Sequence, residues 1–179
     1  MRLFKKCEDM EKILISACLL GQPVRYDGKS LKQQNTLLDI WTKQNRVVSF
    51  CPEVAGGLST PREAAEIIAI DVSTSHSQAI DGTAVLKAVA HVKTSNGQDV
   101  SAEFIKGAQL ALKQCQQHNI QFALLSARSP SCGNEKIYDG SFKGQLIDGQ
   151  GVTAALLSQH GIKVFNQFQL EALAEAIDK

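Results

Sequence analysis

Short apolar runs alternate along the chain with longer segments in which apolar residues recur at helical spacing. A short, partly β-branched apolar run between polar residues is typical of a buried strand. The pattern predicts four such strands, at residues 13–18, 46–51, 122–125 and 162–165. It predicts helices at about residues 31–45, 102–118, 152–160 and 168–178. Strands and helices that alternate in this way indicate an α/β fold with a mainly parallel sheet flanked by helices.

Two segments in the middle of the chain carry more local signals. In Thr60-Pro61-Arg62-Glu63 the threonine can cap a helix, the proline suits a first turn, and the glutamate completes a capping box. We therefore expect a helix from this point to about residue 70. Apolar residues alternate over 83–92 and the turn signal Asn96-Gly97 follows, so we expect an antiparallel or edge hairpin there.

The length and the composition limit the possible kinds of protein. A chain of 179 residues fits one domain with a sizeable core. We expect a charged N-terminal extension over residues 1–12 and a single domain over 13–179, since no linker divides the rest. The charges nearly cancel, 19 Lys and Arg against 18 Asp and Glu, and no long basic block occurs, so nothing favours binding to nucleic acid.

The chain shows no apolar signal core at its start and no apolar run of membrane-spanning length. We expect a cytoplasmic protein without a membrane partner. Its five cysteines include no CxxC pair, and a disulfide framework does not suit a reducing compartment. Metal binding, catalysis and inert burial remain as roles for these thiols.

Three of the cysteines, Cys18, Cys51 and Cys132, lie at or just after the ends of predicted strands. Ligands of open parallel sheets gather beyond the carboxyl ends of the strands, so the fold can bring these thiols together. Three thiolates would leave one metal position open, and soft sulfur ligands favour zinc, copper(I) or an iron–sulfur cluster. Three buried or unrelated cysteines are the alternative, and sequence spacing does not decide between the two.

Three blocks of sequence resemble a family of small bacterial proteins that includes the iron–sulfur thiouracil desulfurases. The first block is Ile15-Ser16-Ala17-Cys18-Leu19-Leu20-Gly21 with Arg25-Tyr26-Asp27-Gly28. The second is Cys51-Pro52-Glu53 with Gly56-Gly57-Leu58-Ser59-Thr60-Pro61-Arg62. The third combines Ser129-Pro130-Ser131-Cys132-Gly133, Tyr138-Asp139-Gly140 and Gly149-Gln150-Gly151-Val152-Thr153. The resemblance covers roughly residues 13–165.

The resemblance implies a Rossmann-like domain with a [4Fe–4S] cluster on Cys18, Cys51 and Cys132. It implies that Glu53 activates water or moves protons, and that Ser129 is a catalytic hydroxyl near the substrate ring. Without the resemblance, Glu53 reads as an ordinary carboxylate near a helix N-terminus and Ser129 as a Ser-Pro turn residue.

Further residues are candidates for contact with a substrate. Asp27 lies in a loop near a cysteine strand, although turn formation alone also explains it. Gly57 could offer its N–H to an anion or simply form a tight turn. Ser131, which lies between Ser129 and Cys132, is a third candidate for contact with the substrate. Ser126 and Asn166-Gln167 depart from the family pattern, which has a lysine and an acidic residue there, so the substrate preference can differ from thiouracil.

The leading hypothesis is a non-redox, iron–sulfur-dependent desulfurase that acts on a thiolated nucleobase such as 2-thiouracil or a related small thioamide. One rival is a cluster-free hydrolase or nucleoside-processing enzyme that uses Glu53 and Ser129. The other is a non-enzymatic module that binds a metal or an iron–sulfur cluster. An iron content near zero after anaerobic reconstitution would remove the leading hypothesis.

Overall fold

A four-stranded parallel sheet forms the centre of the computed structural model, which describes residues 10–70 and 80–178. Its strand order is β2 (Val47–Phe50), β1 (Ile13–Ser16), β5 (Phe122–Leu125) and β8 (Lys163–Asn166). All three pairings are parallel. The predicted fold class and its four sheet strands are therefore confirmed, with boundaries that differ by one or two residues.

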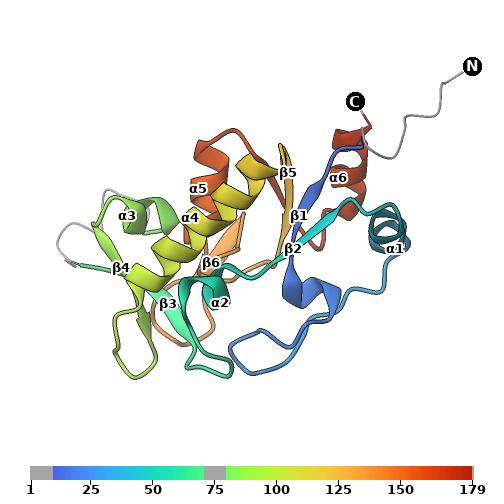
Figure 1. Cartoon of the computed structure of the whole chain (residues 1–179). Coiled ribbons are helices and arrows are strands. Elements are labelled where there is room, and N and C mark those ends of the chain that lie inside the picture. The colour runs from blue at the N-terminus through green and yellow to red at the C-terminus, as the bar shows by residue number, and fades with distance from the viewer. Residues whose placement is uncertain (1–9, 71–79, 179) are drawn as a thin grey trace, which may run out of the picture.

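Helices cover both faces of this sheet (Figure 1). Helices α1 (Thr36–Lys43) and α6 (Leu170–Ile177) pack on the face to which Ile13 and Ile15 point. Helices α4 (Ser101–Gln117) and α5 (Val152–Gln159) pack on the face to which Leu14 points. Alternate residues of β1 thus supply two separate cores, because neighbouring side chains of a strand point to opposite faces.

The helix predicted from Thr60 to about residue 70 is wrong. The chain forms α2 (Pro52–Gly56) earlier, and residues 65–69 are β3 (Ala65–Ala69), which pairs antiparallel with β4 (Ala90–Thr94). Ile67 is buried in a third core with Val92 and Phe104. Pairing with a strand more than twenty residues away outweighs the local helix signal, which is the usual way that tertiary contacts override propensity.

The hairpin predicted over 83–92 is also wrong in its first half. Residues 82–86 are the short helix α3 (Gly82–Leu86), whose N-terminus is capped by the Asp81 carboxylate accepting from the N–H groups of Thr83 and Ala84. Two further elements had no sequence signal that we used. They are the 3-10 helix η2 (Ala17–Leu20) and the hairpin of β6 (Lys136–Tyr138) with β7 (Leu146–Asp148).

Helix α2 lies against α4 with almost no space between their backbones. A β-carbon placed on Gly56 would lie 2.1 Å from the carbonyl oxygen of Glu103, and one on Gly107 would lie 2.1 Å from that of Pro52. Only glycine permits this approach. The contact fixes α2, and with it the segment that begins at Cys51, against the longest helix of the molecule.

The predicted extension over residues 1–12 falls mostly outside the described residues, as does Cys7. None of the helices within residues 10–70 and 80–178 has the length and apolar character that a membrane span requires.

Candidate active site

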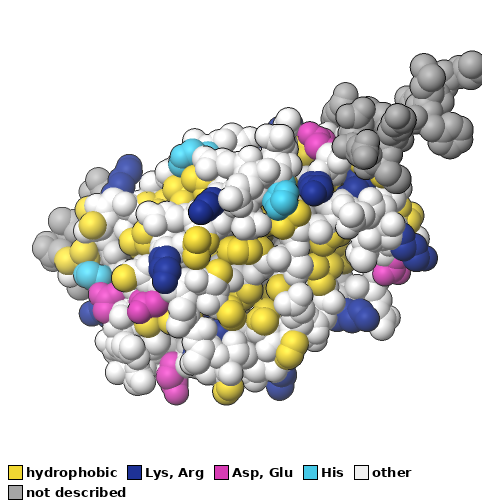
Figure 2. Space-filling model, in the orientation of Figure 1, with side chains coloured by type: hydrophobic (Ala, Val, Ile, Leu, Met, Phe, Trp, Pro, Cys, Tyr) yellow, Lys and Arg dark blue, Asp and Glu magenta, His cyan; other side chains and the backbone are white. Residues whose placement is uncertain are grey.

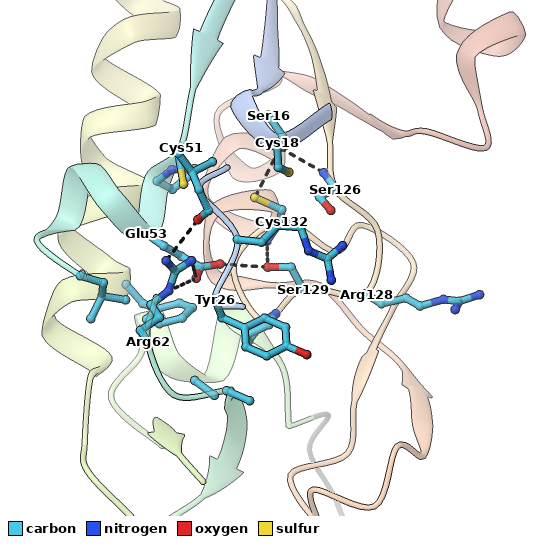
Figure 3. A pocket seen from close by; sticks show the side chains of 18 of the residues that line it. Ser16, Cys18, Tyr26, Cys51, Glu53, Arg62, Ser126, Arg128, Ser129 and Cys132 are labelled. Carbon is cyan, nitrogen blue, oxygen red and sulfur yellow. Dashed lines mark hydrogen bonds and ion pairs between the residues drawn. The ribbon is translucent and has the colours of Figure 1, made fainter. Parts of the chain in front are cut away.

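Three cysteines meet at one end of the central sheet. Cys18 lies in η2 directly after β1, Cys51 is the N-cap residue of α2 directly after β2, and Cys132 lies in the loop that follows β5. Because β2, β1 and β5 are neighbours and parallel, their carboxyl ends share one edge. All three residues line a single cavity of about 940 Å³ (Figure 3). The structure thus brings together the thiols that the strand ends predicted.

The environment of these thiols favours their neutral form. Burial raises the pKa of Cys132, and the nearby charge of Glu53 raises it further. Burial also raises the pKa of Cys18 and Cys51. The Ser16 hydroxyl lies 3.7 Å from the Cys132 sulfur, as its donor, and accepts the N–H of Ser126 at 3.0 Å. A cation at this site would be needed to make all three thiols ionised ligands.

The donor set consists of three free thiols, a set that iron–sulfur clusters use. Across the described parts of the chain, no three His, Cys, Asp or Glu side chains lie close enough to share one metal ion. Ligands of an iron–sulfur cluster bind different irons, so they do not have to meet at one atom. Cys18, Cys51 and Cys132 are all free thiols, and sulfur is the usual protein ligand of such clusters.

Glu53 stands in the first turn of α2, two residues after Cys51. Its side chain is 16% exposed and forms an ion pair with Arg62. The Nε and Nη2 groups of Arg62 both donate to Oε2, the first at 2.9 Å. Oε1 accepts from the hydroxyl of Ser129 at 3.3 Å. One carboxylate oxygen is thus held by the guanidinium, while the other faces Ser129.

Ser129 organises the loop that carries Cys132. Its hydroxyl oxygen accepts the backbone N–H groups of Ser131 at 3.0 Å and of Cys132 at 3.2 Å. The same hydroxyl donates its proton to Glu53. In Figure 3 the three sulfur atoms lie on one side of Glu53 and Ser129. Ser129 therefore connects the carboxylate to the cysteine loop, which the sequence spacing did not show.

Arg62 is a site residue that the sequence analysis did not single out. It belongs to the sequence block of residues 56–62, where the local signals predict a helix that does not form. Its side chain is 9% exposed, and its nearest charged partner is nine residues earlier in the chain. An arginine that follows a loop rich in glycine, serine and proline gives no periodic signal, so only the course of that loop reveals the pairing.

Of the three predicted substrate contacts, Asp27, Gly57 and Ser131, only Gly57 lines the cavity. Its φ of 116° ends α2 in the left-handed conformation, and its N–H donates to the carbonyl of Val54. That N–H is therefore committed to the helix end, which favours the turn interpretation over an anion site.

Asp27 and Ser131 are not among the residues that line the cavity. Asp27 accepts the N–H of Lys29 in a turn and lies 3.5 Å from the Arg25 side chain. Ser131 is fully buried, and its hydroxyl pairs with that of Thr153 at 2.9 Å. The structure gives both a role in holding loops and does not bring either to the cavity wall.

The positions that depart from the family pattern are also near the cavity. Ser126 and Gln167 line it. The side-chain oxygen of Gln167, Oε1, accepts the backbone N–H of Ala127 at 2.8 Å. Asn166 is buried and donates to Asn134 and Glu135. Neutral amides thus hold the end of β8 beside the cysteine loop.

Two aromatic side chains stand at the wall of the cavity and remain exposed, Tyr26 at 45% and Phe168 at 71%. The centre of each ring lies about 6.0 Å from the guanidinium carbon of an arginine, Arg25 for Tyr26 and Arg128 for Phe168.

On the face shown in Figure 2, hydrophobic side chains gather over the middle of the molecule, whereas charged side chains of both signs are scattered.

The fold is thus a parallel α/β sheet in which three neighbouring strands lead to three thiols at one cavity. Residues 13–169 match the family model of 2-thiouracil desulfurase, and the chain belongs to that family. It is 39% identical over 160 residues to the uncharacterised protein YbbK of Bacillus subtilis (strain 168), covering 88% of this chain and 97% of YbbK.

The fold also matches a solved structure. The [4Fe–4S]-dependent thiouracil desulfidase TudS aligns with a TM-score of 0.80 and 48% sequence identity, covering 94% of this chain and 98% of TudS. At this level of identity and coverage the two chains share the fold over nearly their whole lengths, and the family identified from the sequence blocks is confirmed.

Proposed function

We propose that this chain is a [4Fe–4S]-dependent desulfurase that replaces the sulfur of a thiolated pyrimidine such as 2-thiouracil by oxygen. The observation that carries the proposal is the convergence of Cys18, Cys51 and Cys132 on one cavity beside Glu53 and Ser129. Membership of the 2-thiouracil desulfurase family and the likeness to TudS support it. We take residues 13–179 as one domain and place the enzyme in the cytoplasm, where free thiols persist.

Cys18, Cys51 and Cys132 would hold the cluster. A cluster with three protein ligands keeps one iron open and, when bound, supplies a Lewis acid for the sulfur of a C=S group. The chain itself places Cys18 and Cys51 directly after β1 and β2 and fixes α2 against α4, while the Ser129 hydroxyl holds the loop that carries Cys132.

The overall reaction needs water and no electrons. In 2-thiouracil the C=S bond breaks, a C=O bond to the water oxygen forms, and both protons of the water leave with the sulfur as hydrogen sulfide. The carbon keeps its oxidation state. The chain must therefore supply groups that accept and return protons, and no external reductant or oxidant is required.

Glu53 accepts a proton from the attacking water. Its Oε2 is occupied by two N–H groups of Arg62, whereas Oε1 has only the Ser129 hydroxyl as partner among the described residues. Oε1 is thus the atom with a free lone pair for a water proton. Ser129, whose hydroxyl contacts the same oxygen, passes a proton to a ring heteroatom as charge develops on the substrate.

The experiment is an anaerobic turnover assay of the reconstituted protein with 2-thiouracil. The proposal predicts uracil and sulfide in equal amounts, and Glu53→Gln should lower turnover by about 100-fold or more, since general bases contribute that much. Glu63→Gln is the matched control because Glu63 is an exposed carboxylate of the same cavity wall, and within residues 10–70 and 80–178 it accepts only from Ser95. Undiminished sulfide release from Glu53→Gln would remove Glu53 from the mechanism.

A further inference from the structure

The guanidinium of Arg62 has a protein acceptor for each of its nitrogens. Nε and Nη2 donate to Oε2 of Glu53. Nη1 lies within hydrogen-bond distance of three acceptors, the carbonyl oxygens of Val24 at 3.2 Å and Ser59 at 3.1 Å and the hydroxyl of Thr60 at 3.3 Å. With its side chain 9% exposed, the guanidinium is locked in one orientation.

This locked orientation joins two loops to α2. The backbone N–H of Arg62 donates to the carbonyl of Tyr26 at 2.8 Å, and its side chain holds Val24 in the same loop. A planar guanidinium with fixed donors dictates the plane and direction of the carboxylate that it binds, which a flexible ammonium group cannot do. The loops therefore determine, through Arg62, how the carboxylate of Glu53 is turned.

The two oxygens of Glu53 have different partners because of this arrangement. Both arginine N–H groups point at Oε2, so Oε1 is the oxygen left toward Ser129, at 3.3 Å from its hydroxyl. If Glu53 were free to rotate about its last side-chain bond, either oxygen could meet Ser129 or turn away from it. The ion pair removes that freedom before a substrate arrives.

We propose that Arg62 is a positioning residue, which turns the Glu53 carboxylate so that Oε1 faces Ser129 and the cavity. It acts through Glu53, because Nε and Nη2 both donate to one oxygen of that carboxylate. The inference rests on the proposed function in so far as Glu53 handles a proton of the reaction. Its alternative is that Arg62 only ties the two loops together.

A double-mutant cycle in the turnover assay separates these two roles. Arg62→Ala should lower kcat by about 10- to 100-fold with little change in KM, because small misplacements of a reacting group have effects of this size. In the Glu53→Gln background the same change should cost less than about threefold, since residues that act through one another are not additive. Arg62→Lys should lose nearly as much, since an ammonium group does not fix the plane of the carboxylate. Equal losses in both backgrounds would overturn the proposal.

The matched control is Arg46→Ala. Arg46 also ties a loop by donating to a backbone carbonyl, that of Glu11, but it does not line the cavity. Its removal should leave turnover within about twofold of the unmodified protein. A similar loss of turnover in Arg46→Ala would show that loosening any loop is enough, and the positioning role would fall.

A crystal structure of Arg62→Ala, or of Arg62→Lys if the alanine variant does not fold, gives a second readout that needs no activity. We expect Oε1 of Glu53 to leave hydrogen-bond distance of the Ser129 hydroxyl. A carboxylate that keeps its contact with Ser129 would contradict the proposal. If the unmodified enzyme releases no sulfide, the proposed function fails, while this comparison still decides whether Arg62 positions Glu53.

Discussion

Replacing Ser129 by alanine should destabilise the protein even when it contains no cluster and no substrate. The Ser129 hydroxyl accepts two backbone N–H groups, those of Ser131 and Cys132. Both residues are buried, at 0% and 5% exposure, so water has little access to their N–H groups. A buried polar group left without a partner costs about 1–3 kcal/mol. Two such groups make the expected loss about 2–6 kcal/mol.

The assay is equilibrium unfolding by urea, followed by circular dichroism, on the protein free of iron. Ser141→Ala is the matched control. Its hydroxyl likewise accepts a backbone N–H, that of Lys143, and donates to a carboxylate, that of Asp139, but all of these contacts are exposed. Water can take over there, so we expect a change within about 0.5 kcal/mol.

A loss below about 0.5 kcal/mol in Ser129→Ala would refute the reasoning, because it would mean that the two N–H groups find other partners. The expected result has a consequence for kinetics. A fall in turnover in Ser129→Ala then contains a contribution from the loosened Cys132 loop, and a chemical role for the hydroxyl has to be measured as the excess over that contribution.

Two further predictions concern packing and pH. Gly107→Ala should lower the free energy of unfolding by about 2 kcal/mol or more, since its β-carbon would lie 2.1 Å from the Pro52 carbonyl oxygen. Lys106→Ala, on the exposed side of α4, should change the free energy of unfolding little. Equal unfolding midpoints for the two variants would contradict the close approach of α2 and α4. Burial raises the pKa of Cys115 from 9.0 to about 12. As the pH rises, the thiol therefore loses its proton first in the unfolded chain. The free energy of unfolding should fall between pH 9 and pH 12, by up to about 1.4 kcal/mol per pH unit. Cys115→Ala should show a shallower decline of stability over that range, and identical slopes would exclude the buried thiol as the cause.

The central sheet could be predicted from the sequence because of how parallel strands are buried. The strand at residues 122–125 is buried at every position, and such strands appear in the sequence as short apolar runs without alternation. The convergence of the cysteines followed from the same property, since strand ends of a parallel sheet share an edge. The order β2-β1-β5, which brings the three strand ends side by side, is visible only in the structure.

The segment from Thr60 to residue 70 shows why a local signal was not enough. Pro52-Glu53 and Pro61-Arg62-Glu63 both resemble helix starts, and only the first begins a helix. The second leads into β3, whose pairing with β4 depends on residues about 25 positions later. The buried Ser131–Thr153 contact, between residues 22 positions apart, was hidden in the same way. The Arg62–Glu53 ion pair depends instead on the course of the loop between the two residues.

The account depends above all on the claim that Cys18, Cys51 and Cys132 form one iron–sulfur site. The most direct test is the iron and acid-labile sulfide content per chain after anaerobic reconstitution. We expect about four of each in the unmodified protein and in Cys115→Ser, whose thiol is buried away from the cavity. Serine at Cys18, Cys51 or Cys132 should abolish or strongly reduce both. Full iron and sulfide in any of these three variants, or none in the unmodified protein, would contradict the account.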